Sequence, residues 1–275
     1  MKVTTLLENK TSCDTLRCEH GLSLYIETER HKILFDSGAS DAFWTNAEAL
    51  GIDLTQVDLA VLSHAHNDHC GGLLTFLERN RTAKVYLQKE AFGAYYVVTP
   101  SKCAYIGLDE ALRGYMDRFV LTEGVTRLDD ELTLFSGIQT HELLSEANAT
   151  LREKVGEEYP RDPFRHEQDL LVTESGKTVL FAGCAHNGIV NILNRARDIL
   201  GRAPDYVFAG FHLYNPSLGQ SEPRCLVDAV GERLRTLRAT RYITGHCTGE
   251  EAYGWLRETL GNQLAYMATG TSFTI

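Results

Sequence analysis

The sequence lacks the features that mark membrane and secreted proteins. No stretch approaches the roughly 20 consecutive apolar residues that a membrane-spanning helix needs, and residues 1–14 contain no apolar segment typical of a signal peptide. The seven cysteines are odd in number and form no Cys-x-x-Cys pair. We therefore expect a reduced, cytoplasmic protein without a membrane partner, not a disulfide framework.

Positive charge is also scarce. The 275 residues carry a net charge of −10 with the histidines neutral, so we expect no nucleic-acid partner. An acidic protein can still bind a small anionic substrate if its binding site contains a positive group. Bound metal ions often supply the largest local charge in such a site. The apolar content of 43% and charged content of 23% are those of a globular protein with a substantial core.

Strand and helix patterns follow one another through both halves of the chain. Short apolar runs such as 57–63 and 177–184 predict strands covered on both faces. Segments 188–201 and 224–239 predict helices, and the Ser-Gly pair at 175–176 predicts a tight hairpin. The fold class is therefore α/β, with two sheets flanked by helices in a single domain over residues 1–275.

Residues 88–125 interrupt this pattern. They are rich in tyrosine and phenylalanine and mix polar and apolar residues without one clear period. We interpret them as a cap or lid inserted over a site, and an ordinary connecting subdomain is the alternative.

The stretch VLSHAHNDHCGGL, residues 61–73, contains three of the ten histidines within six positions. Residues i and i+2 of an extended segment point the same way, so His64 and His66 can hold one ion. Asp68 and His69 come after the turn and can face a second ion. Imidazole and carboxylate together suit zinc first, with manganese or iron as alternatives. A polar loop that is merely rich in histidine is the competing interpretation.

Other predicted strands end in residues of the same kind. Ligands of α/β proteins gather outside the carboxyl ends of strands, and five strands here deliver a metal-binding or acid–base side chain to that edge: Asp36, His64, Cys184 with His186, His212 and His246. We predict that His186 and His246 bind metal and that Asp36 orients the cluster through hydrogen bonds.

Alternatives stay open for the remaining candidates. Cys184 is either a metal-binding thiolate or a buried cysteine, and His212 contacts either substrate or metal. His166 has either a supporting role or a ligating one. We expect ordinary roles for three further histidines: His20, His31 and His141.

These motifs resemble those of the metallo-β-lactamase superfamily. SHAHNDHCGGL resembles its His-x-His-x-Asp-His signature, ILFDSG its leading strand-end aspartate, and TGHCTG its final histidine motif. The resemblance implies an αββα sandwich with a dinuclear site at one edge of the two sheets. FAGC resembles the strand whose terminal Gly-Asp supplies a bridging ligand, but Cys184 stands where that aspartate would be. The bridge would then be a thiolate, or His186 would replace it.

Four motifs together resemble one branch of this superfamily, the 7,8-dihydropterin-6-methyl-4-(β-D-ribofuranosyl)-aminobenzene-5′-phosphate synthases of methanopterin biosynthesis. These motifs are EHGLSLYIET, GCAHNGIVNIL, GFHL and TGHCTG. The similarity spans nearly the whole chain and is weakest between residues 88 and 165.

Three functions follow as hypotheses. The first is a dinuclear hydrolase of a phosphate ester or thioester, with metal-bound hydroxide as nucleophile; one ion would be held by His64, His66 and His186, the other by Asp68, His69 and His246. The second is transfer of a dihydropterin-methyl group with release of diphosphate. Aromatic residues of the insert would then stack on the pterin, or they pack in a core, as such residues more often do: Phe92, Tyr95, Tyr96, Tyr105 and Tyr115. The third is iron-dependent redox chemistry.

Overall fold

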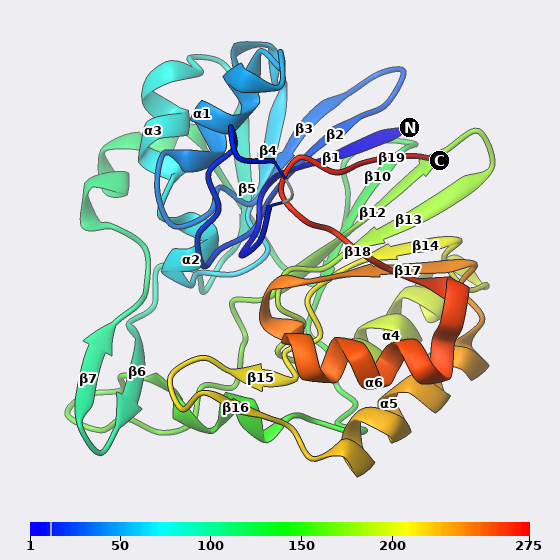
Figure 1. Cartoon of the computed structure of the whole chain (residues 1–275). Coiled ribbons are helices and arrows are strands. Elements are labelled where there is room, and N and C mark those ends of the chain that lie inside the picture. Colours follow the sequence, from blue (N-terminus) through cyan, green and yellow to red (C-terminus); the bar gives the residue numbers. More distant parts are fainter. Residues whose placement is uncertain (12) are drawn as a thin grey trace.

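Two seven-stranded sheets pack face to face in the computed structural model, which describes residues 1–11 and 13–275 (Figure 1). The first sheet has the order β19-β1-β2-β3-β4-β5-β8. Its strands are β1 (Lys2–Leu7), β2 (Ser23–Glu27), β3 (Lys32–Phe35), β4 (Leu59–Val61), β5 (Lys84–Gln88), β8 (Phe119–Thr122) and β19 (Ser272–Thr274). Because β19 pairs with β1, the two chain ends lie side by side (Figure 1).

The second sheet has the order β18-β17-β14-β13-β12-β10-β9. Its strands are β9 (Val125–Arg127), β10 (Leu132–Ser136), β12 (Gln168–Glu174), β13 (Lys177–Phe181), β14 (Tyr206–Phe208), β17 (Arg241–Thr244) and β18 (Leu264–Tyr266). The predicted hairpin joins β12 to β13, and Ser175 and Gly176 at its tip have φ of 50° and 76°. Both values lie in the left-handed region that a two-residue hairpin turn requires.

Helices cover the outer face of each sheet. On the first sheet lie α1 (Ala42–Ala49) and α3 (Leu73–Arg79), and on the second lie α4 (Ile189–Leu200), α5 (Arg224–Leu237) and α6 (Glu250–Leu260). Between the sheets, side chains such as Ile33, Phe35, Leu170 and Phe181 form a separate buried core. The αββα layering predicted from the sequence is confirmed. No helix of the described residues is long and apolar enough to span a bilayer.

A small sheet stands apart from the two main sheets, at the lower left of Figure 1. We call it the cap sheet; it consists of β6 (Tyr95–Thr99), β7 (Lys102–Tyr105) and β11 (Leu151–Glu153), in the order β11-β6-β7. The predicted insert of residues 88–125 differs from this structure at its end, because β8 is the edge strand of the first main sheet. The predicted insert also did not include β11. This strand pairs with β6 from about 50 residues away in the chain, and no local sequence pattern signals such a long-range pairing.

The remaining elements are short. They are α2 (Asn67–Cys70), the pair β15 (Tyr214–Asn215) and β16 (Gln220–Ser221), and the 3₁₀ turns η1 (Leu54–Gln56), η2 (Glu110–Arg118), η3 (Glu146–Thr150), η4 (His246–Thr248) and η5 (Gly261–Gln263).

Candidate metal centre

The carboxyl ends of parallel strands bring the predicted residues to one edge. Strands β3 and β4 are parallel in the first sheet, as are β13, β14 and β17 in the second. Within four residues of the ends of three of these strands, Asp36, His212 and His246 adopt φ of 58°, 44° and 51°. Left-handed backbone at non-glycine residues costs of the order of 1 kcal/mol each and is typical of functional sites. Here it turns each side chain sharply off its strand toward the edge.

The donor atoms of the predicted ligands form overlapping groups. In each group the ligand atoms lie within 4.8 Å of one another: Asp68, His69, Cys184 and His246; His64, Cys184 and His186; His64, His66 and Asp68. The structure therefore brings together all six predicted ligands. Cys184, His64 and Asp68 each belong to two of these groups, so the groups share residues as neighbouring ion sites would.

The hydrogen bonds of His69 and His246 fix which ring nitrogen carries the proton. His69 Nδ1 lies 2.7 Å from Asp36 Oδ2, and His246 Nδ1 lies 2.8 Å from Asn9 Oδ1. Both partners are acceptors, so each Nδ1 donates and each Nε2 presents a lone pair, that of His69 also 3.1 Å from Cys184 Sγ. Yet the two Nε2 atoms lie only 3.1 Å apart. Two lone pairs facing each other at this distance repel unless a metal ion lies beside both or a proton bridges them. Burial lowers the pKa of His69, but Asp68 and Asp36 outweigh it and raise that pKa, so metal and proton compete for this position.

His64 and His186 repeat this arrangement. Ser63 Oγ donates to Asp36 Oδ2 at 2.7 Å and can therefore accept from His64 Nδ1 at 2.9 Å. Asn148 donates its amide to the His186 carbonyl oxygen, which leaves Asn148 Oδ1 to accept from His186 Nδ1 at 2.8 Å. The two bare Nε2 atoms then face each other at 3.3 Å. The donor set thus fits two divalent cations, each ligated by imidazoles that an outer hydrogen bond orients.

Burial sets the protonation states of these groups. It lowers the pKa of His64 and His186 well below the ordinary value, so both are neutral imidazoles that can ligate at neutral pH. Burial raises the pKa of Asp68, but His69, His20 and His246 outweigh it and hold that pKa well below its usual range. Burial also raises the pKa of the Cys184 thiol. A cation that binds the sulfur would remove its proton.

Three histidines near the groups differ in their contacts: His66, predicted as a ligand, and His212 and His166, whose roles the sequence left open. His66 Nε2 and both ring nitrogens of His212 are buried without a hydrogen-bond partner among the described residues, which is costly unless a ligand satisfies them. The His212 nitrogens form a further group with the sulfurs of Cys184 and Cys247. His166 is different, because its Nδ1 accepts the Ala65 N–H at 3.1 Å and its Nε2 contacts Asp162 at 3.0 Å. Of the two alternatives for His166, these contacts favour the supporting role, since it holds the loop that carries His64 and His66.

Several functional contacts were not predicted. His20, expected to be ordinary, lies 3.3 Å from Asp68 Oδ2. Glu8 accepts the His246 N–H at 2.5 Å, and Glu167 accepts the His186 N–H at 2.6 Å. Asn9 follows β1, so the rule of strand ends would have found it. His20 and Asn148 lie in irregular segments whose sequences carry no such signal.

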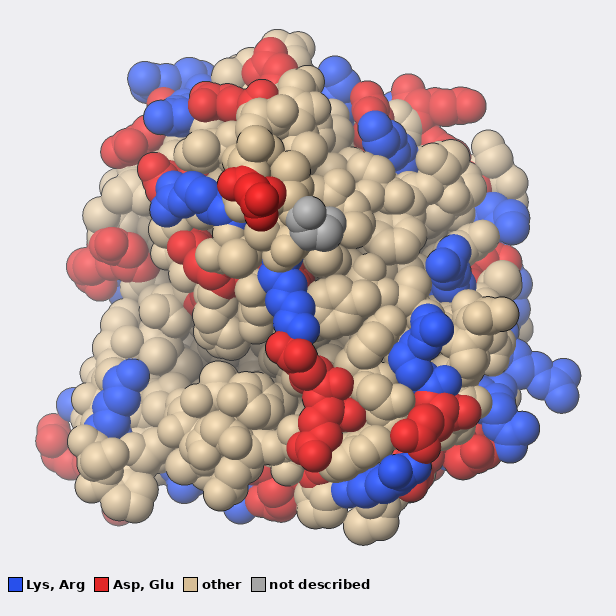
Figure 2. All heavy atoms as spheres, viewed as in Figure 1, with Lys and Arg blue, Asp and Glu red and all other residues tan. Residues whose placement is uncertain are grey.

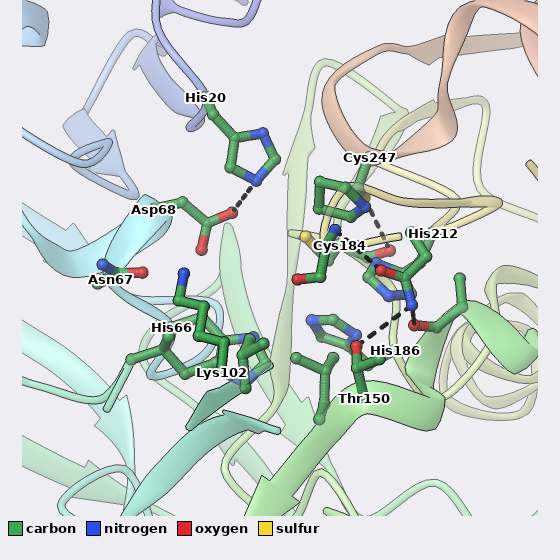
Figure 3. A pocket seen from close by; sticks show the side chains of 17 residues that line it. His20, His66, Asn67, Asp68, Lys102, Thr150, Cys184, His186, His212 and Cys247 are labelled. Carbon is green, nitrogen blue, oxygen red and sulfur yellow. Dashed lines mark hydrogen bonds and ion pairs between the residues drawn. The ribbon is translucent and has the colours of Figure 1, made fainter. Parts of the chain in front are cut away.

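The metal-binding groups open into a cavity of about 320 Å³. Figure 2 shows this face of the molecule hollowed, and Figure 3 shows His66, Asp68, Cys184, His186 and His212 around the cavity. On the side of the cap sheet its walls are Val97, Ile106 and Leu151, with Lys102 near them.

Of the two alternatives for the aromatic residues of the insert, the structure favours packing over stacking in this cavity. Of the five aromatic residues predicted to stack on a pterin, none is among its described lining residues. Tyr95 packs on His166 with ring centroids 3.9 Å apart, Tyr96 packs on Tyr105 at 5.4 Å, and Phe92 packs on Phe119 at 5.6 Å. These aromatic side chains stabilise the cap and its junction with the first sheet instead.

Replacing His20 by alanine is expected to lower turnover about three- to tenfold, because Asp68 loses one of the imidazoles that fix its position. The number of bound metal ions should stay unchanged, since His20 lies outside the ligand groups. Steady-state kinetics and metal analysis check both expectations, with the exposed His141→Ala variant as the matched control. Loss of an ion from His20→Ala would instead make His20 a ligand.

Comparison with known proteins defines the class. The model of the Metallo-beta-lactamase superfamily matches residues 16–246, so the chain belongs to this superfamily. Among solved structures, Tm1679, described as a metal-dependent hydrolase of the beta-lactamase superfamily, is similar with a TM-score of 0.84 and 25% identity, over 100% of this chain and 99% of that one.

Two relatives come from Methanocaldococcus jannaschii. The chain is 28% identical to its 7,8-dihydropterin-6-methyl-4-(beta-D-ribofuranosyl)-aminobenzene-5'-phosphate synthase, over 94% of this chain and 91% of the synthase. It is 29% identical to the uncharacterised protein MJ0448, over 77% of this chain and 80% of that protein. The narrower resemblance to the synthase branch is thereby confirmed.

Proposed function

We propose that this protein is a dinuclear metal-dependent hydrolase of a small anionic substrate such as a phosphate ester or thioester. The observation that carries the proposal is the convergence of four imidazole Nε2 atoms in two pairs, 3.1 Å and 3.3 Å apart, next to a cavity that His186, Asp68 and Cys184 line. His64, His66 and His186 would hold one ion, Asp68, His69 and His246 the other, and Cys184 would lie between them. Divalent ions at these positions, zinc first among them, supply Lewis acidity and lower the pKa of water.

The remaining chemistry belongs to the chain itself. Asp68 lines the cavity as a carboxylate, with His20 and His246 within 3.3 Å of its Oδ2. It can orient a water molecule and accept its proton. His212 lies on the cavity wall with its ring centroid 4.2 Å from that of His186. Its partnerless nitrogens can donate to, or accept from, a substrate oxygen as the bond to the leaving group breaks.

A second candidate is transfer of a dihydropterin-methyl group with release of diphosphate. The observation that favours it is the similarity to the synthase over 94% of the chain. The same residues would then bind the departing diphosphate. The aliphatic cap side of the cavity offers no aromatic surface for the pterin among the described lining residues, so we place this candidate second.

The test is metal analysis of protein purified without added metal, combined with turnover of phosphodiesters and thioesters before and after chelation. We expect about two zinc or manganese ions per chain, and turnover that chelation abolishes and metal restores. Two ions with diphosphate release that requires both pterin and aminobenzene substrates would establish the transferase instead. Iron with a visible absorption band would favour redox chemistry. Less than one ion after reconstitution would contradict a metal centre altogether.

A further inference from the structure

Lys102 is the only lysine or arginine among the described residues that line the cavity. It begins β7 and pairs with Thr99 across the cap hairpin. Figure 3 shows its side chain extending from the cap toward Asp68 and His66. No carboxylate of the described residues pairs with its ammonium group, although the chain carries a net charge of −10. A cation left unpaired beside a cavity is available to a ligand.

The other cations of the same region are paired or lie away from the cavity, as Arg152 of β11 does. Arg161 contacts Glu146 at 2.9 Å and Arg165 contacts Glu153 at 2.7 Å. The Lys154 ammonium lies over the Tyr159 ring, 5.8 Å from its centroid, and Lys154 does not line the cavity. Lys102 is therefore distinct from its neighbours in both position and partners.

The cap also supplies an apolar surface. Val97 of β6 pairs with Leu151 of β11, and the two side chains are 8% and 7% exposed. Together with Ile106, which follows β7, they form the aliphatic lining of the cavity. Such a wall gains free energy from covering an apolar part of a ligand and offers no hydrogen bond to a polar part.

We propose that the cap recognises the substrate in two parts: Lys102 binds an anionic group, and Val97, Ile106 and Leu151 pack against an apolar body attached to it. The substrate class is thus a small amphiphilic anion, such as a phosphate or carboxylate joined to an aliphatic or similar apolar moiety. This inference rests on the proposed function, because it assigns the substrate of the same site. The cavity of about 320 Å³ limits that substrate to a small molecule.

Methylphosphonate and n-hexylphosphonate, whose P–C bonds are not hydrolysed, are suitable probes, titrated by calorimetry into the metal-loaded full chain. The hexyl compound should bind at least about tenfold more tightly to the wild type, because its extra methylenes cover the aliphatic wall. Lys102→Met should weaken both ligands by a similar factor of about five to ten, and Lys102→Arg should retain most of the affinity. Val97→Thr, which keeps the side-chain volume, should weaken the hexyl compound selectively. Lys154→Met is the matched control and should bind both as the wild type does.

Each outcome decides a separate point. Equal affinity of the wild type for the two phosphonates would overturn the apolar half of the proposal, and unchanged affinity in Lys102→Met would overturn the anionic half. Lys102 is exposed, so its variants should fold, and thermal unfolding verifies this. Binding is measured without turnover; absence of hydrolysis with this pattern intact would contradict the proposed function but support recognition by the cap. Hydrolysis without this pattern of affinities would support the proposed function but contradict recognition by the cap.

Discussion

Asp68→Asn is expected to reduce turnover at least about 1000-fold while the protein stays folded. The carboxylate lies within 3.6 Å of a nitrogen of His20, His69 and His246, and all three hold its pKa down. An amide of the same shape preserves the packing, but it carries no charge to bind a cation and cannot accept a proton from water. The second ion should therefore bind more weakly as well. Steady-state kinetics at saturating metal, metal analysis and thermal unfolding measure the three effects.

The matched control is Asp198→Asn, on the exposed face of α4 and away from the ligand groups. It makes the same chemical change and should leave turnover, metal content and stability at the wild-type level. Wild-type turnover in Asp68→Asn would remove this carboxylate from the mechanism. A variant that fails to fold would indicate that Asp68 is needed chiefly to offset the buried histidines.

The sequence was informative wherever a functional residue follows a buried strand. Asp36, His64, Cys184, His186, His212 and His246 were all predicted at one edge, because parallel strands place their carboxyl ends together. The spacing within residues 64–69 likewise predicted two sets of ligands, and the structure separates His66 and His69 into different groups. Local chain geometry decided these placements, so local sequence was sufficient to predict them.

Contacts between distant irregular segments could not be predicted in this way. Asn148 reaches His186 from η3, and β11 joins the cap sheet from the same region. Neither segment has a repeating pattern, and their positions depend on packing of the whole chain. Composition alone could not decide between stacking and packing for the aromatic residues of the insert. The structure places Tyr95 and Phe92 in packing contacts, where their large apolar area is buried.

Asp36→Asn is expected to weaken metal binding about 10- to 100-fold. Asp36 Oδ2 accepts hydrogen bonds from both Ser63 Oγ and His69 Nδ1, at 2.7 Å each. With an amide NH₂ at this position, Ser63 would have to accept a hydrogen bond and could then donate to His64 Nδ1. His69 Nδ1 would also have to accept. Both imidazoles would then carry their proton on Nε2, the atom that faces the ligand group, and neither could bind a cation there.

The opposite orientation of the amide does not avoid the cost. Its NH₂ would then face the Ser63 N–H, which Asp36 Oδ1 accepts at 2.7 Å, and a buried donor left without an acceptor costs about 1–3 kcal/mol. The backbone itself is no obstacle, because asparagine tolerates the left-handed conformation that Asp36 adopts at φ 58°. The variant therefore tests the hydrogen bonds and not the strain.

Calorimetric metal titration and thermal unfolding, with and without metal, measure the Asp36→Asn variant. Without metal we expect a loss of about 1–3 kcal/mol, and with metal a larger deficit, because the wild type gains stability from ions that the variant binds weakly. Asp205→Asn is the matched control: Asp205 Oδ2 accepts the Thr178 N–H at 2.8 Å, and Asp205 is absent from the ligand groups, so only stability should fall. Wild-type metal affinity in Asp36→Asn would show that the tautomers of His64 and His69 are fixed by something other than this carboxylate.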